Sequence, residues 1–442
     1  MLEPKTHTRD EVGGGTKPTA GLFRELEARG LVQDTSNPDL GRLLDEESIV
    51  VYCGFDPTSD SLQLGNLVPL ITLARFQRFG HRPIVVLGGG TGMIGDPSGR
   101  SDERNLLDEE TIARNVAGQR SQFAKVLDFD STENPAIMVN NADWLTKLDL
   151  IDFLRDVGKS FSINVMMSRE SVKQRIAAQS GLSFTEFSYQ ILQAYDFFHL
   201  YNEYGCRLQV GGSDQYGNIL AGVDYIRRKT GHDHGAAALT FPLVQSSTGE
   251  KLGKTAAGAL WLDPERTSPY EWYQYWLNVS DADAVRYLKS FTFLELDEIS
   301  EIESEFLKQP KERLAQRTLA REMTSLIHGL EQTQKAERAS AALFNSHGSA
   351  SGLAIDGAPE VTAPKDEVIS GFNLLNALVR TGLAKSNSEA KRLMRQGSVS
   401  VNGIKVGADT GKSSIVAADL KDDGTCIIAV GRRRRAILRF SD

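Results

Sequence analysis

The chain has 442 residues, which is too long for one ordinary domain, so we expect two to four compact units. Hydrophobic residues make up 40% and charged residues 24%, and the absence of a long uncharged apolar run excludes a membrane-spanning protein. Cys53, Cys206 and Cys426 form no C-x-x-C pair, which argues against a disulfide framework or a zinc site and predicts a cytoplasmic protein.

Charge is distributed unevenly along the chain. The formal net charge is −8, yet residues 371–442 contain 13 Lys and Arg against 6 Asp and Glu. Phosphate contacts are made mainly by Lys and Arg. An acidic body with a basic tail therefore suits a catalytic unit that carries a polyanion-binding appendix, although a solvated basic face would have the same composition.

The first half of the chain predicts a parallel sheet flanked by helices. Residues 1–20 offer little that could be buried, so we expect a disordered lead-in. After it, short β-rich runs such as IVVYCGF and PIVVL alternate with helical stretches such as PLITLARFQRFG. This alternation is typical of an α/β domain, which we place at residues 21–265.

The pattern then changes to helix and later to a small mixed unit. Residues 266–344 carry apolar side chains three and four apart, which predicts a helical domain. Residues 345–370 are rich in Ser, Gly, Ala and Pro and are interpreted as a linker. In residues 371–442, two helical stretches precede a hairpin with Asn402-Gly403 as its turn, which indicates a small α+β domain.

A glycine-rich loop follows the strand PIVVL. The pattern G-x-G-x-x-G is formed by Gly90, Gly92 and Gly95. It would suit a dinucleotide-binding enzyme, but Pro97 and Gly99 stand where that motif needs a helix. A phosphate-binding P-loop also fails, because Ile94 replaces its first glycine and Arg100 its lysine. A glycine-rich turn without a ligand remains the alternative for this segment.

Two further segments have features of a nucleotide site. The run YCGFDPTS ends a strand, and Gln63–Asn66 opens the next helix, whose N-terminus would bind an anion. Much later, Lys251–Thr255 places two ammonium groups on a loop that contains glycine. Flexible lysines suit a polyphosphate that must be held and then released.

Together these segments resemble a known family. Gln63–Asn66 is similar to the HIGH signature of class I aminoacyl-tRNA synthetases, and Lys251–Thr255 is similar to their KMSKS signature. The runs YCGFDPTSDSLQLGN, GGTGMIGDPSGR, FTEFSYQILQAYDF and GGSDQYGN resemble the bacterial tyrosyl branch and occur in its order. The resemblance implies a Rossmann-like catalytic domain, a helical anticodon-binding domain and a C-terminal tRNA-binding domain.

The run FTEFSYQILQAYDF can also be interpreted from its residues alone. Ser183 and Glu186 fit a capping box, and Tyr189, Gln193 and Asp196 follow at helical spacing on one face. Polar core residues satisfied by their neighbours would explain such a face too. The resemblance favours a substrate site instead.

The resemblance implies a role for each of these positions. The residues implied to bind tyrosine are Tyr52 and Asp196 at the phenol, Asp96, Tyr189 and Gln193 at the ammonium group, and Gln215 at the carboxylate. Those implied to bind ATP are Cys53, Gly54, Asp56, Gly65, Gly212, Asp214 and Lys254. Those implied to act on the phosphates in catalysis are Thr58, Gln63, Asn66, Arg100, Arg104, Lys251, Lys254 and Thr255.

The implied reaction joins tyrosine to tRNA(Tyr). Tyrosine would react with ATP to give tyrosyl-adenylate and pyrophosphate, and would then be transferred to the 3′ end of the tRNA. Mg²⁺ would accompany ATP, and no protein-bound metal is expected. Catalysis would consist of positioning and electrostatic stabilisation, because no residue has to be a nucleophile. Paired groups at the phenol would reject phenylalanine, an effect for which tyrosyl-tRNA synthetases are the standard example.

Two positions depart from the family pattern. Gln63 stands where histidine is usual, and its amide can donate to a phosphate but never carries imidazolium charge. Arg100 stands where lysine is common. A synthetase-like RNA-binding protein that no longer activates tyrosine is the alternative, but the presence of residues such as Asp196 and Lys251 argues against it.

The basic tail resembles an RNA-binding module shared with a ribosomal protein. The cations expected at tRNA phosphates are Lys385, Lys391, Arg392, Arg395, Arg432 and Arg433, with the run continuing to Arg435. That run could instead be a nuclear address. The family also implies a homodimer, to which the apolar region from Phe184 to Phe187 could contribute, and no membrane partner.

Overall fold

The computed structural model describes most of the chain. The described residues are 21–98, 106–177, 181–249, 252–255, 258–344, 360–406, 412–421, 423–431 and 434–441. Contacts divide the chain into two compact units, one formed by the residues up to Thr267 with Ser280–Ala315, and the other by Ser268–Val279 with Gln316–Asp442. The predicted lead-in 1–20 lies outside the described residues. Among the described helices, none has the length and apolar character needed to span a membrane.

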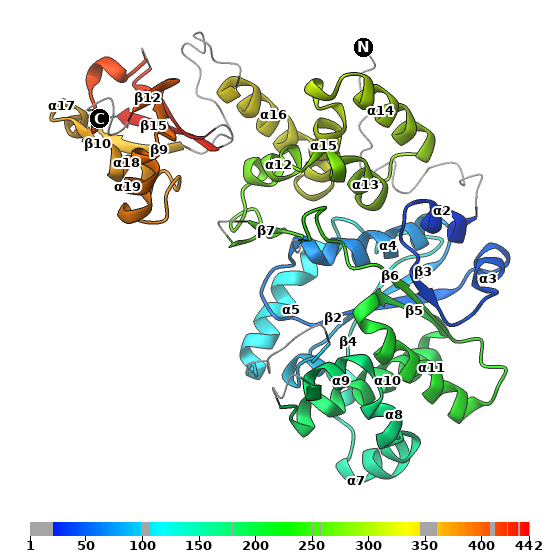
Figure 1. The fold of residues 1–442 in the computed structure, drawn as a ribbon. Helices are drawn as coiled ribbons and strands as arrows, with labels where there is room; N and C mark the ends of the chain where they lie inside the picture. The colour runs from blue at the N-terminus through cyan, green and yellow to red at the C-terminus, as the bar shows by residue number, and fades with distance from the viewer. Residues whose placement is uncertain are drawn as a thin grey trace. The chain divides into compact units, whose positions relative to one another are not determined.

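The first unit is built on a six-stranded sheet (Figure 1). Its strands are β1 (Asp34–Thr35), β2 (Val50–Phe55), β3 (Arg82–Leu87), β4 (Ile137–Asn140), β5 (Cys206–Gly212) and β6 (Ala237–Phe241), in the order β1-β6-β5-β2-β3-β4. Strands β2 to β6 pair in parallel, and only the short β1 is antiparallel to its neighbour. The chain order reverses between β2 and β5, which is where ligands bind in open α/β sheets. The predicted parallel α/β fold is confirmed.

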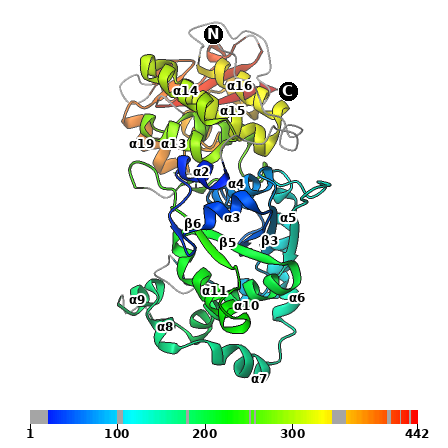
Figure 2. The same ribbon diagram turned by 90° about the vertical axis from the view of Figure 1, so that its right-hand side faces the viewer.

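Helices cover both faces of this sheet, as expected for strands whose residues are almost all buried. The main ones are α4 (Leu67–Arg78), α5 (Glu109–Phe123), α10 (Phe184–Tyr204) and α11 (Tyr216–Thr230). Shorter ones are α2 (Leu22–Ala28), α3 (Leu40–Glu46), α6 (Ala142–Leu145), α7 (Leu150–Asp152), α8 (Ile163–Met167) and α9 (Glu170–Ala177). Figures 1 and 2 show the strands between α4 on one side and α10 with α11 on the other.

Helix α10 carries the polar face predicted from the sequence, and its start differs from the prediction in one respect. The Ser183 hydroxyl accepts a hydrogen bond from the N–H of Glu186, as the capping box requires. The Glu186 carboxylate, however, forms a buried ion pair with Arg175 of α9 at 3.0 Å instead of reaching back to the cap. Gly205 ends the helix in the left-handed conformation, with φ of 63°.

Two more helices, α13 (Asp281–Phe291) and α14 (Leu296–Lys308), belong to the first unit. Buried guanidinium groups from the sheet region bind carbonyl groups in the last turn of α13 and just after it. Arg75 of α4 donates to the carbonyl oxygens of Ser290, at 3.1 Å, and Thr292, and Arg29 donates to that of Leu294 at 2.6 Å. These bonds satisfy carbonyl groups that a helix end leaves without partners.

The second unit contains three helices and a small α+β module. The helices are α12 (Pro269–Leu277), α15 (Leu314–His328), whose first two residues belong to the first unit, and α16 (Leu330–Phe344). The module has a five-stranded sheet in the order β12-β11-β14-β15-β9, formed by β9 (Glu360–Pro364), β11 (Val399–Val401), β12 (Ile404–Val406), β14 (Thr425–Val430) and β15 (Arg434–Ser441). A second pair is formed by β10 (Phe372–Asn373) and β13 (Ser414–Ile415).

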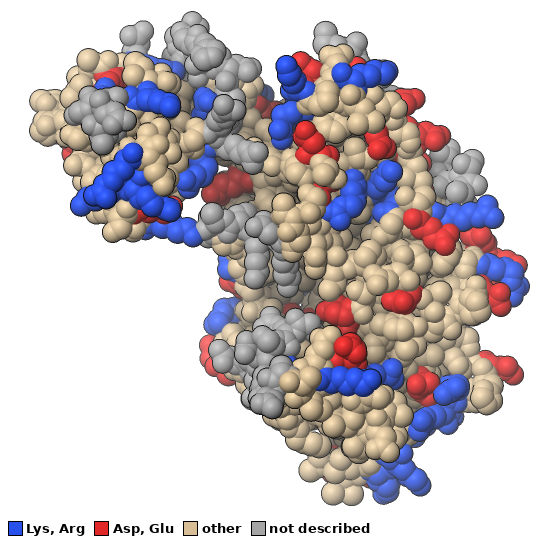
Figure 3. All heavy atoms as spheres, in the orientation of Figure 1, with Lys and Arg blue, Asp and Glu red and all other residues tan. Residues whose placement is uncertain are grey.

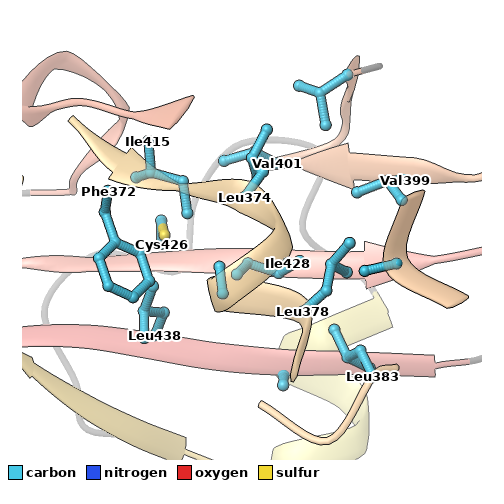
Figure 4. Packing of buried hydrophobic residues seen from close by; sticks show 14 of the residues in the cluster. Phe372, Leu374, Leu378, Leu383, Val399, Val401, Ile415, Cys426, Ile428 and Leu438 are labelled. Atoms are coloured by element: carbon cyan, nitrogen blue, oxygen red, sulfur yellow. The ribbon is translucent and has the colours of Figure 1, made fainter. Parts of the chain in front are cut away.

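Three helices complete the module, namely α17 (Lys365–Ile369), α18 (Leu374–Arg380) and α19 (Asn387–Arg395). Figure 4 shows Leu374 and Leu378 of α18 packed against Val401, Ile428 and other buried strand residues. Ordered elements of this module, β9 and α17, lie inside the range predicted as a linker.

The predicted hairpin of the module is confirmed. Strands β11 and β12 are joined by Asn402 and Gly403, and both turn residues have positive φ, of 48° and 83°. A two-residue turn of this kind needs left-handed conformations at both positions, which asparagine and glycine adopt more readily than other residues.

Candidate active site

A cavity of about 910 Å³ opens at the carboxyl ends of β2 and β5. Many residues predicted to bind substrate line it, although they come from distant parts of the sequence. They are Tyr52, Cys53, Gly54, Asp56, Thr58, Gln63, Gly65, Asn66, Asp96, Tyr189, Gln193, Asp196, Gly212, Asp214 and Gln215.

One end of the cavity contains a buried carboxylate and a buried phenol. Asp196 of α10 accepts hydrogen bonds from Asn141 Nδ2 at 2.9 Å and from Trp144 Nε1 at 2.7 Å. Tyr52 of β2 is 1% exposed, with its ring 5.3 Å from that of Phe197. Its hydroxyl has no hydrogen-bond partner among the described residues. A ligand hydroxyl that reached this end could donate a hydrogen bond to Asp196, and the Tyr52 hydroxyl could either donate a hydrogen bond to it or accept one from it.

Burial sets the protonation of this pair. Burial raises the pKa of Asp196 to about 7, and the hydrogen bonds from Asn141 and Trp144 only partly oppose the shift. Burial, with the nearby Asp196 charge as the second cause, raises the pKa of Tyr52 well above its usual value. Tyr52 is therefore a neutral phenol at any ordinary pH.

A second group of carboxylates lies further along the cavity. Asp56 accepts hydrogen bonds from the Tyr189 hydroxyl at 2.9 Å and from the Thr91 hydroxyl at 2.8 Å. Asp96 accepts one from Gln215 Nε2 at 2.7 Å. Burial raises the pKa of Tyr189, with Asp56 as the next cause, so this hydroxyl is a donor.

The charge of this cavity favours a cationic ligand group. Asp56, Asp96, Asp196 and Asp214 all line it, whereas its lining contains no Lys or Arg within the described parts of the chain. Oxygen atoms on several sides are the partners an ammonium group needs, since it has three donors and no acceptor.

A hydrogen-bonded chain joins the two groups of carboxylates. Asn141 Nδ2 donates both to Asp196 and to the Thr91 hydroxyl, the latter at 2.9 Å, and Thr91 in turn donates to Asp56. The side chains of Thr91 and Asn141 are buried. We call this chain, from Asp56 through Thr91 and Asn141 to Asp196, the carboxylate bridge.

The glycine-rich loop supports this bridge. A Cβ atom at Gly88 would lie 2.1 Å from Asp56 Oδ1, so only glycine allows the carboxylate to approach. The N–H of Gly90 donates to Asn141 Oδ1 at 2.7 Å. A backbone N–H of this loop therefore binds a protein side chain. In a phosphate-binding P-loop, the backbone N–H groups bind the phosphate instead.

The two predicted nucleotide signatures meet in the lining of the cavity. The N–H of Gln63 donates to Asn66 Oδ1 at 2.9 Å, and the N–H of Leu64 donates to the carbonyl oxygen of Leu260 at 3.0 Å. Gly253, in the lysine loop, has φ of 76°, and a Cβ atom there would lie 2.9 Å from Leu64 Cβ. These segments are nearly two hundred residues apart in the sequence.

Some predicted residues cannot be placed. Those outside the described residues are Arg100, Arg104, Lys251, Arg432 and Arg433. Lys254 and Thr255 form the short strand β7 (Lys254–Thr255), which pairs with β8 (Gly258–Ala259), and only their backbone is described. Among the described residues, no group of three or more His, Cys, Asp or Glu side chains could hold a metal ion.

Comparison with known proteins identifies the family. The model for "tRNA synthetases class I (W and Y)" matches residues 44–345. The tyrosine–tRNA ligases of Roseiflexus castenholzii and Geobacillus stearothermophilus are 48% and 46% identical to the chain, over 95% of its length and 99% and 100% of theirs. The chain belongs to the tyrosine–tRNA ligase family.

A solved structure supports the membership. The C-terminally truncated mitochondrial tyrosyl-tRNA synthetase of Aspergillus nidulans has a TM-score of 0.66 and 33% identity to the chain. The match covers 73% of this chain and 94% of that one. The predicted fold class and the predicted family are therefore confirmed.

The C-terminal module of this tyrosine–tRNA ligase matches a second family model. An S4 domain model matches residues 373–409, which include α18, α19 and the β11–β12 hairpin. Four of the predicted phosphate-binding residues are exposed there, namely Lys385, Lys391, Arg392 and Arg395. Figure 3 shows Lys and Arg side chains gathered over the α19 end of the module.

Part of the predicted basic run has another role. Arg434 Nη1 donates to the carbonyl oxygen of Leu383 at 3.1 Å, and Arg435 Nη1 donates to that of Leu343. Each of these guanidinium groups thus binds a backbone acceptor of the protein through one of its five N–H donors, and phosphate binding by the run up to Arg435 stays a prediction.

Three residues of the site were not predicted from the sequence. Thr91, Asn141 and Trp144 bind the carboxylates directly or through one another. A signal was available for Asn141, because Asn140 is the last residue of β4 and Asn141 follows it, at the strand end where a parallel sheet binds its ligands. Trp144 gave no such signal, since an isolated tryptophan usually belongs to a core.

Proposed function

We propose that the cavity binds tyrosine and ATP and forms tyrosyl-adenylate, from which tyrosine passes to the 3′ end of tRNA(Tyr). The observation that carries this proposal is the pair of Tyr52 and Asp196 at the buried end of the cavity. The tyrosine hydroxyl would donate to Asp196 and accept from Tyr52. A phenylalanine ring in the same place would leave both buried groups without that partner, which is costly.

The ammonium and carboxylate groups of tyrosine then lie toward the nucleotide. Asp96, Tyr189 and Gln193 would surround the ammonium group, and Gln215 would contact the carboxylate. The structure also supports a share for Asp56, since it binds Tyr189 at 2.9 Å. The carboxylate would attack the α-phosphate in line, with pyrophosphate as the leaving group.

ATP would lie between the two signatures. Cys53, Gly54, Gly65, Gly212 and Asp214 line this part of the cavity and would hold the nucleoside, while Thr58, Gln63 and Asn66 would face the phosphates. Burial raises the pKa of Cys53 to about 12, so its thiol is neutral and can only make a weak polar contact. Mg²⁺ would enter with ATP, and the residues proposed to stabilise pyrophosphate are Arg100, Arg104, Lys251, Lys254 and Thr255.

Amino-acid-dependent pyrophosphate exchange tests the activity. Exchange should occur with tyrosine and fall to background with phenylalanine and tryptophan. Exchange with tryptophan would assign the protein to the other branch of its family. Exchange with none of the three, in a protein that still binds tRNA, would favour the RNA-binding alternative.

The basic C-terminal module is proposed to bind tRNA(Tyr). Replacing Lys391, Arg392 and Arg395 by alanine should lower tRNA charging at least tenfold and leave pyrophosphate exchange within twofold, because these side chains are exposed and lie outside the substrate cavity. Equal loss of both activities would contradict this assignment. The loss of charging should also become smaller as salt is raised, since phosphate contacts are screened.

A homodimer in the cytoplasm completes the proposal. Exposed apolar side chains gather on the α7–α10 segment, with Leu150 68%, Ile163 60% and Phe184 76% exposed. Such a patch is typical of an interface. Light scattering should give twice the chain mass, and Phe184→Asp should shift the protein toward the monomer. A monomeric wild-type protein at micromolar concentration would contradict the dimer.

A further inference from the structure

Helix α5 presents three buried amide side chains to the loop that precedes the first nucleotide signature. Asn115, Gln119 and Gln122 are spaced four and three residues apart, so they share one face of the helix. Their side chains are 5%, 3% and 5% exposed, although amides usually face water. We call these three residues the amide ladder.

The ladder binds the backbone of the loop at successive points. Asn115 Nδ2 donates to the carbonyl oxygen of Pro57 at 2.8 Å. Gln119 Nε2 donates to that of Ser59 at 2.7 Å. Gln122 contacts the loop backbone with the opposite polarity, because its Oε1 accepts from the N–H of Leu62 at 2.8 Å, while its Nε2 donates to the Ser61 hydroxyl at 3.1 Å. The loop makes no regular secondary structure in this stretch, so these side chains satisfy backbone groups that would otherwise be buried without partners.

The helix backbone itself touches the loop between these contacts. A Cβ atom at Gly118 would lie 2.2 Å from the carbonyl oxygen of Asp60. Glycine inside a helix costs about 1 kcal/mol relative to alanine. The close approach explains why it stands here, one residue before the central member of the ladder.

The loop carries Thr58 and leads directly into Gln63, and both line the cavity. None of the ladder residues does. Residues outside the ladder bind the loop as well. Arg266 donates to the Ser59 hydroxyl at 2.8 Å, and the N–H of Leu262 donates to the Leu62 carbonyl oxygen at 2.9 Å. The loop is therefore hydrogen-bonded to two separate segments, which restricts the positions of the residues that it contributes to the cavity.

We infer that Asn115, Gln119 and Gln122 are positioning residues for ATP, acting through the backbone that places Thr58 and Gln63. The inference rests on the proposed function, in which Thr58 and Gln63 face the phosphates. At the tyrosine end of the cavity, Asp196 belongs to α10, Asn141 and Trp144 follow β4, and Tyr52 lies inside β2, before the loop begins. The ladder should therefore affect ATP far more than tyrosine.

The polarity of each contact gives a sharp test. In Gln119→Glu and Asn115→Asp, a carboxylate oxygen replaces the amide donor and faces a carbonyl oxygen. In Gln122→Glu, the oxygen that accepts from the N–H of Leu62 is retained, and the Ser61 hydroxyl, which accepts from Nε2 in the wild type, can donate to the new carboxylate oxygen. The first two variants should lower kcat/KM for ATP in pyrophosphate exchange at least tenfold, a factor that corresponds to about 1.4 kcal/mol, while Gln122→Glu stays within threefold. Gln122→Met, which loses the acceptor, should behave like the first two.

Two further measurements and one further variant separate positioning from simple destabilisation. The dissociation constant for tyrosine should stay within twofold of wild type in every variant. The defect of Gln119→Glu, relative to wild type at the same pH, should shrink as the pH is lowered, because a protonated carboxyl regains a donor for Ser59. Gly118→Ala, which displaces the loop without changing an amide, should also weaken ATP and spare tyrosine.

The outcomes keep this inference separate from the proposed function. If wild type supports no exchange with tyrosine, the proposed function fails, and the ATP role of the ladder fails with it. If wild type is active but Gln119→Glu and Gln122→Glu lose the same factor, or tyrosine binding falls in proportion to ATP use, the inference alone is overturned.

Discussion

Replacing Thr91 by valine removes one hydroxyl from the middle of the carboxylate bridge and keeps the shape of the side chain. That hydroxyl donates to Asp56 at 2.8 Å and accepts from Asn141 at 2.9 Å. Loss of a hydrogen bond to a charged group costs about 1.5–3 kcal/mol, and the unpaired Asn141 donor adds about 1 kcal/mol. Because Thr91 is buried, we expect Thr91→Val to lower the free energy of unfolding by about 2–4 kcal/mol.

Urea unfolding of wild type, Thr91→Val and Thr91→Ser measures this cost. Serine keeps the hydroxyl and loses only a methyl group, so it should cost about 1 kcal/mol. Tyrosine binding should weaken in Thr91→Val and remain near wild type in Thr91→Ser, since Asp56 orients Tyr189. The reasoning is refuted if valine and serine have equal effects, or if valine changes the stability by less than 0.5 kcal/mol, taken as about the resolution of the method.

Further predictions concern charge and the nucleotide. The pKa of Asp196 is raised to about 7, above its value in the unfolded chain, so the protonated carboxyl stabilises the fold at low pH and this stabilisation is lost as pH rises through 7. In urea unfolding, Asp196→Asn should therefore flatten the decline of the unfolding free energy between pH 4 and 8. An unchanged pH profile would contradict this prediction. Gln63→Ala should slow adenylate formation by the equivalent of about 1–3 kcal/mol, whereas an unchanged pre-steady-state rate would show that Gln63 donates nothing to ATP. Arg175→Met leaves Glu186 buried without its cation and should cost about 3–5 kcal/mol; a loss below about 1 kcal/mol would mean that water reaches the carboxylate.

The sequence predicted the parts of the fold that depend on local pattern. The β-rich runs became β2 and β3, and Asn402-Gly403 became the hairpin turn, because these features follow from side-chain alternation and from φ preferences of single residues. The cavity residues were found through resemblance to a family. Physical reasoning alone had left open whether the polar face of α10 is core or site.

Contacts between distant segments could not be predicted in this way. Glu186 was expected to close a capping box, yet its carboxylate binds Arg175, a residue outside the helix it begins. No pattern in the sequence indicated the amide ladder, because its partners are 58 to 61 residues away. Likewise, four consecutive arginines suggested one surface role, and only the path of β15 shows that Arg434 and Arg435 bind backbone oxygens.

The buried arginines of the first unit bear on how the chain can fold as it is synthesised. Arg29 and Arg75 belong to the first part of the sheet unit, but their acceptors lie at residues 289–294. Until that stretch has left the ribosome, both guanidinium groups would have to be buried without these carbonyl acceptors or remain in contact with water. A shortened catalytic fragment ending at Thr267 would stay in that incomplete state permanently, so a self-sufficient fragment has to extend through α13 and α14.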